Sequence, residues 1–162
     1  MSRMIRISAL VVTMVMCASA AIAQGKIADL RARLAQEPNA VSKAKLMPQL
    51  GDAEFAEIDA DVTKEKFLEA LAVLGHYRDE VDTCDKALAA TGADAEKHPA
   101  GFKQLQFSLR DSLRRLDAVL VSMTTDEQAP FLAIRTDLGE VNLRLIQHLF
   151  PHDTPAKPES SK

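Results

Sequence analysis

The sequence predicts an all-α fold: an antiparallel helical bundle with three long helices plus shorter N-terminal helices. Apolar residues recur at helical spacings in every long segment, and strict alternation of apolar and polar residues never lasts for the length of a strand. Aromatic residues make up only 4% of the chain and Trp is absent, so the core must consist mainly of aliphatic side chains, which favours helix packing.

The first residues have the three parts of a cleavable signal peptide. Arg3 and Arg6 give a positive start, Ile7–Met16 is apolar, and Ala21–Ala23 is a small-residue cleavage signal before Gln24. Cleavage after Ala20 is an open alternative, because the residues before that bond are also small. The segment that ends at Ala23 is also about as long as a membrane span, which leaves an uncleaved anchor as a further alternative.

We therefore divide the chain into three parts. Residues 1–23 are predicted to be the signal peptide, and residues 24–150 a single all-α domain. Residues 151–162 contain three prolines and no core residue, which predicts a disordered C-terminal tail.

The shorter N-terminal helices are predicted before residue 60. Lys26–Gln36 places Ile27, Leu30 and Leu34 on one face and ends before Pro38. Ser42–Ile58 carries Pro48 and Gly51, from which we expect a break, with Asp52 as the N-cap of two further turns.

The three long helices follow. Thr63 is expected to cap the first, which continues to Gly92, and Pro99 is expected in the first turn of the second. Thr125 and Gln128 resemble a capping box for the third, although Pro130 predicts a separate first turn. The inward faces are predicted to carry Phe67, Leu71, Leu74, Val81, Cys84 and Leu88; Phe102, Leu105, Leu109, Leu113, Leu116, Leu120 and Met123; and Phe131, Ile134, Leu138, Val141, Leu145 and Leu149.

Four stretches of the sequence are distinctive: Leu50–Phe55, Tyr77–Val81, Pro99–Gln106 and Leu145–Pro151. They resemble stretches of a group of uncharacterised exported helical proteins from acidobacteria. The resemblance implies an exported helical fold, and it implies no reaction, ligand or site. The segment Glu69–Leu71 is similar to the second helix of a tetratricopeptide repeat, but no 34-residue period is visible, which leaves repeat-like helix hairpins as an alternative arrangement.

Charge and cysteine content limit the partners. The leader has two arginines and no acid, so the rest of the chain is more negative than the formal net charge of −3, and a nucleic-acid partner is not expected. After leader cleavage we expect no membrane span, and a periplasmic or secreted location. Cys84 is then the only cysteine, which excludes an internal disulfide. The oligomeric state stays open.

The titratable residues predict no catalytic, cofactor-binding or metal site. His76 and Glu80 are four residues apart, and a solvated helix face is the favoured interpretation. His148 and His152 have the same spacing, but Pro151 lies between them and a third ligand is missing. A calcium loop from Asp59 would need glycine at its sixth position, where Lys64 stands.

The remaining charged residues and the thiol are given ordinary structural roles. Cys84 lies on an apolar stripe, so we expect a buried, inert thiol. An ordinary charged helix face is predicted for Asp79, Glu80, Asp82 and Asp85. Pairing with the acidic helix that precedes them is predicted for Lys103, Arg110, Arg114 and Arg115.

Two hypotheses of function remain. The preferred one is a non-enzymatic exported module that binds a protein or peptide partner in a groove between helices. The alternative is a bundle that binds a small ligand or a metal ion through side chains that converge from facing helices. Two polar residues that face each other across the core would favour the alternative, whereas an exposed apolar groove would favour the first.

Overall fold

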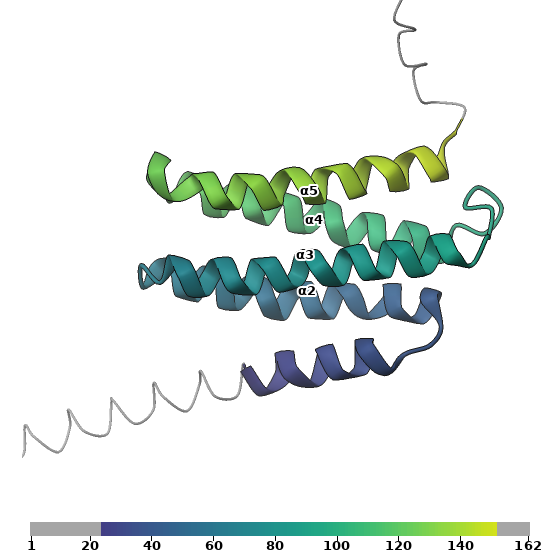
Figure 1. The fold of residues 1–162 in the computed structure, drawn as a ribbon, viewed down its shortest axis with the longest axis horizontal. Coiled ribbons are helices and arrows are strands. Elements are labelled where there is room, and N and C mark those ends of the chain that lie inside the picture. The colour runs from purple at the N-terminus through teal and green to yellow at the C-terminus, as the bar shows by residue number, and fades with distance from the viewer. Residues whose placement is uncertain (1–23, 152–162) are drawn as a thin grey trace, which may run out of the picture.

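The computed structural model describes residues 24–151 as five helices, with no strand in that part of the chain (Figure 1). The all-α fold is therefore confirmed. The helix of residues 24–36, here called the N-terminal helix, precedes four long helices. These are α2 (Ala40–Thr63), α3 (Phe67–Ala90), α4 (Ala100–Val121) and α5 (Thr125–Leu149). The predictions for the signal peptide, for His152 and for the tail after Pro151 lie outside the described residues.

The long helices form two antiparallel hairpins that stack on each other. One hairpin is α2 with α3, and the other is α4 with α5 (Figure 1). In the stack α2 packs beside α4, and α3 packs beside α5, with the members of each pair running in the same direction. The N-terminal helix lies along the other side of the first hairpin (Figure 1). The long helices therefore form a helical bundle built from stacked hairpins.

The predicted break at Pro48 and Gly51 is wrong, because α2 is continuous and Asp52 is no N-cap. The structure therefore has four long helices instead of three. A proline inside a helix costs about 3 kcal/mol, but residues on both sides of Pro48 are buried on one continuous face. Burial of that face, at about 1.5–3 kcal/mol per large apolar side chain, outweighs the proline. The buried apolar side chains of this face are Ala44, Met47, Leu50, Phe55 and Ile58.

The helix ends differ from the predicted ones by a few residues. Thr63 ends α2, and its hydroxyl donates a 2.7 Å hydrogen bond to the carbonyl of Asp59, so it does not cap α3. The capping box of α5 is formed by Thr124 and Glu127, one residue before the predicted pair. Pro130 lies inside an uninterrupted α5.

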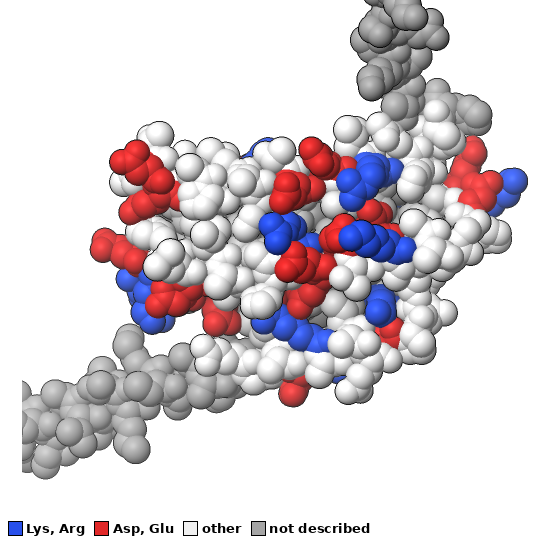
Figure 2. Space-filling model, viewed as in Figure 1, with Lys and Arg blue, Asp and Glu red and all other residues white. Residues whose placement is uncertain are grey.

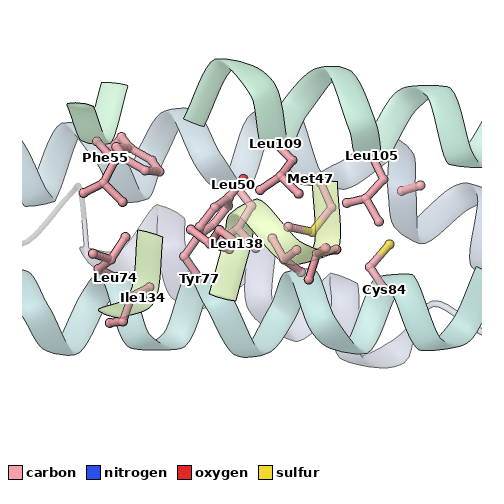
Figure 3. Packing of buried hydrophobic residues seen from close by; sticks show 14 of the residues in the cluster. Met47, Leu50, Phe55, Leu74, Tyr77, Cys84, Leu105, Leu109, Ile134 and Leu138 are labelled. Carbon is pink, nitrogen blue, oxygen red and sulfur yellow. The ribbon is translucent and has the colours of Figure 1, made fainter. Parts of the chain in front are cut away.

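The core runs through all five helices, and the predicted apolar faces are largely confirmed. Figure 3 shows how buried side chains of α2, α3, α4 and α5 meet in this core. The exceptions are Phe67, Leu71 and Leu113, which are only partly buried. Tyr77 is fully buried although no pattern predicted it, and its ring packs edge-on against Phe55 with the ring centroids 5.4 Å apart. No helix in the described part of the chain is long and apolar enough to cross a membrane.

Candidate functional site

Three charged side chains meet beneath the N-terminal helix. Glu54 of α2 has no exposed surface, and one of its oxygens, Oε1, accepts a 2.9 Å hydrogen bond from Nε of Arg31 and a second from Nη2. Nε of Arg31 also lies 3.0 Å from Oε1 of Glu80 on α3, whose side chain is 17% exposed. One guanidinium group therefore bridges two carboxyl groups and joins three helices.

The two carboxyl groups share a proton at neutral pH. Burial, and after it the charge of Glu80, raises the pKa of Glu54 to about 8 although Arg31 acts in the opposite direction. Burial also raises the pKa of Glu80. Two neighbouring buried carboxyl groups do not readily ionise together, so the pair carries about one negative charge, which Arg31 balances.

Each glutamate keeps one oxygen without a partner. The Oε2 atoms of Glu54 and Glu80 are buried, and neither has a hydrogen-bond partner in the described part of the chain. A proton held between the two carboxyl groups is donated by one glutamate and accepted by the other, so it can satisfy one oxygen of each. When that proton leaves, the two buried Oε2 atoms become acceptors without a donor.

An open groove of about 310 Å³ lies beside this pair, between the N-terminal helix and α3. We call it the Arg31 groove. Its lining residues are Arg31, Leu34, Ala35, Lys43, His76, Asp79, Glu80, Thr83 and Cys84. Figure 2 shows acidic and basic side chains gathered over α3 and α5 on the viewed face and along the boundary between α3 and the N-terminal helix.

A second buried polar contact lies deeper in the core. The hydroxyl of Tyr77 is 2.7 Å from Oγ of Ser112 on α4. A Cβ atom added at Gly51 would lie 3.4 Å from Oγ of Ser112 and 3.4 Å from the Tyr77 ring, which is ordinary van der Waals contact. Burial raises the pKa of Tyr77 to about 12, so its hydroxyl stays protonated.

The thiol of Cys84 is buried, as predicted, with 1% of the residue exposed. Burial raises its pKa to about 12 although Lys43 lowers it. Since the thiolate is the reactive form, this environment disfavours nucleophilic chemistry.

The structure corrects the predicted roles of two acidic residues on α3. Glu80 is not on a solvated face, because the N-terminal helix covers it and Arg31 pairs with it. Asp85 is 6% exposed, and its Oδ2 accepts a 3.1 Å hydrogen bond from Arg144 of α5, so it is not part of an ordinary charged face. His76 is exposed, as predicted, and Asp79 is exposed and pairs with Arg78.

The basic side chains of α4 do not pair with α3. Arg115 binds Asp52 of α2 at 2.7 Å, and Arg114 binds Asp111 of its own helix at 3.1 Å. Arg110 lies over the ring of Phe107, and Lys103 makes no ion pair with the described residues. The prediction fails because α4 packs mainly on α2 and α5 in the stack.

Two of the residues that form the site, Arg31 and Glu54, were missed by the sequence patterns. Glu54 stands four residues from both Leu50 and Ile58, so a continuous α2 would have placed a carboxyl group in its apolar face. Because a break was expected in this segment, the helical spacing of Glu54 from these apolar residues was not taken as a sign of burial. Arg31 gives no comparable signal, since a basic residue on a short helix is ordinary.

The described residues contain no group of three His, Cys, Asp or Glu side chains arranged to hold a metal ion. His148 instead packs edge-on against Phe102, with the ring centroids 6.2 Å apart. Comparison with protein-family models, with curated proteins and with solved structures found no match to this chain.

Proposed function

We propose that this protein is a non-enzymatic helical module that binds a ligand group in the Arg31 groove. The supporting observation is that Glu54 and Glu80, from two different helices, face each other inside the fold beside an open groove. Buried ion pairs usually stabilise a fold less than apolar residues of the same volume. A bundle with a purely structural role gains little from such a cluster, whereas a binding site uses it to select a ligand.

The size of the groove indicates what fits. At about 310 Å³ it is at the lower end of small-molecule pockets, which span roughly 300–1,000 Å³. A helix that docks through several side chains needs a longer apolar groove. The occupant is therefore a small molecule, or a single side chain presented by a protein or peptide partner.

The non-enzymatic role is supported by the state of the candidate reactive groups. The pKa of the Cys84 thiol is raised to about 12, and Glu54 has no exposed surface that a substrate could reach. Export to the periplasm or the medium rests on the leader pattern of residues 1–23 and on the resemblance to exported acidobacterial proteins. N-terminal sequencing of the protein recovered after export tests it, with Gln24 or Ala21 as the expected first residue.

The binding function can be tested by NMR with a library of small cationic, neutral and anionic fragments. We expect binding fragments to shift the backbone amides of Ala35, Thr83 and Cys84. Ala35→Trp, which fills the groove, should abolish these shifts, whereas Ala32→Trp, on the exposed side of the same helix, should preserve them. Shifts that survive in Ala35→Trp, or a library without any binder at these amides, would refute the proposal.

A further inference from the structure

We infer that the group bound in the Arg31 groove is an alkylammonium ion, which pairs with the carboxylate of Glu80. This inference rests on the proposed binding function. An alkylammonium group occurs both in free amines and in the side chain of lysine, and the chemistry at the groove is the same for both.

The balance of charge favours a cation. The cluster contains two carboxyl groups and one guanidinium group, so a second cation is needed before both glutamates can ionise. When the shared proton leaves, the buried Oε2 atoms of Glu54 and Glu80 become acceptors, and an ammonium group supplies three donors. Glu54 is fully buried, so its carboxyl oxygens lie inside the site and not in an exposed acidic patch.

Access to the cluster is through Glu80. Its side chain lines the groove and is 17% exposed, so a ligand in the groove can reach it. Leu34 and Ala35 form an apolar part of the wall, which suits the alkyl portion of the ligand.

An anionic ligand fits less well. Arg31 already contacts both glutamates, and an anion at this position would face their charge. Lys43 and Asp79 also line the groove with opposite charges, while Arg31 balances the charge of the glutamate pair.

Exchange of a proton for the ligand makes binding depend on pH. The charged or titratable groups that face the pair or line the groove are Arg31, Lys43, His76, Tyr77, Asp79 and Cys84. Because the pKa of Glu54 is about 8 and an alkylammonium stays charged below pH 9, affinity should rise about tenfold per pH unit up to about pH 8.

The test is an NMR titration with n-butylammonium, with n-butanol as the neutral probe and butyrate as the anionic probe. We expect only n-butylammonium to shift the groove amides, and we expect its affinity to rise with pH as described. Glu80→Gln should weaken it at least about tenfold. Glu69→Gln, an exposed change on the same helix, should leave it unchanged. Circular dichroism of both variants checks that they remain folded.

Two further probes distinguish the sources of the ammonium group. Equal affinity for n-butylammonium and for a capped Gly-Lys-Gly peptide supports a free amine, and tighter binding of the peptide supports a partner's lysine. Groove binding of n-butanol or butyrate at equal affinity, or unchanged butylammonium affinity in Glu80→Gln, would overturn the inference and leave the binding function intact. A complete absence of binding by any fragment would overturn both.

Discussion

Glu54→Gln should make the protein more stable at alkaline pH. The folded protein retains a proton on Glu54 up to about pH 8, whereas the unfolded chain releases it near the ordinary value of 4.5. The unfolded state therefore binds fewer protons between these values, so the contribution of Glu54 to the free energy of unfolding falls as pH rises through this window and is constant above it. The contribution of Glu54 to the free energy of unfolding is largest below about pH 4.5.

The magnitude follows from the pKa values. A rise from 4.5 to about 8 corresponds to about 5 kcal/mol, of which about 4 kcal/mol falls between about pH 5 and about pH 9. In Glu54→Gln the amide imitates the protonated acid, since it can accept from Arg31 and donate to Glu80. The variant should match the natural protein near pH 5 and exceed it by up to about 4 kcal/mol near pH 9.

Urea denaturation across this pH range measures the effect. Asp94 and Asp117 do not interfere, because Lys97 and Arg135 hold their pKa values below the ordinary 3.8. Glu96→Gln, an exposed change in the loop before α4, serves as the control and should follow the natural protein at every pH. A natural protein whose stability is constant or rises with pH, or a Glu54→Gln variant that keeps the same pH dependence, would refute the reasoning.

Three further changes test the packing. Leu109→Asp places a charge at a site with 0% exposure and should cost about 3 kcal/mol or more, whereas Leu113→Asp, at a partly buried site, should cost less; thermal unfolding followed by circular dichroism compares them. Gly101→Ala puts a Cβ atom 2.6 Å from Cδ2 of Leu88 and should destabilise the fold by about 1–3 kcal/mol, while Gly139→Ala, with nothing within 4 Å, should not. Cys84→Ser should cost about 1–3 kcal/mol, and the native thiol should react slowly with a labelling reagent until the chain is unfolded; fast native labelling would contradict its burial.

Helix periodicity predicted the fold class and most of the core from the sequence. Ile27, Leu30 and Leu34 are buried as expected, and so is every predicted inward residue of α5. The prediction failed where a local rule opposed tertiary packing. Pro48 favours a break in isolation, but the apolar face that spans it holds α2 in one piece.

The candidate site was harder to predict because it depends on which helices become neighbours. Glu80 belongs to a charged helix face until the N-terminal helix covers it, and the partner of Asp85 is 59 residues away on α5. Arg144 and Asp85 become neighbours only because α3 and α5 stack side by side. The spacing of residues along one helix does not show which helices become neighbours in the fold.

The stacked hairpins also imply an order of assembly. Each hairpin closes through a short connection, at residues 64–66 and 122–124, so most of its contacts join segments that are close in sequence and can form early. The N-terminal helix needs both α2 and α3, since Arg31 contacts one residue from each. During synthesis it emerges before either partner exists, and it has to remain undocked until residue 80 is available. Only Ile27, Leu30 and Leu34 of this helix are buried, so its amides should exchange with solvent through local opening well below the free energy of global unfolding.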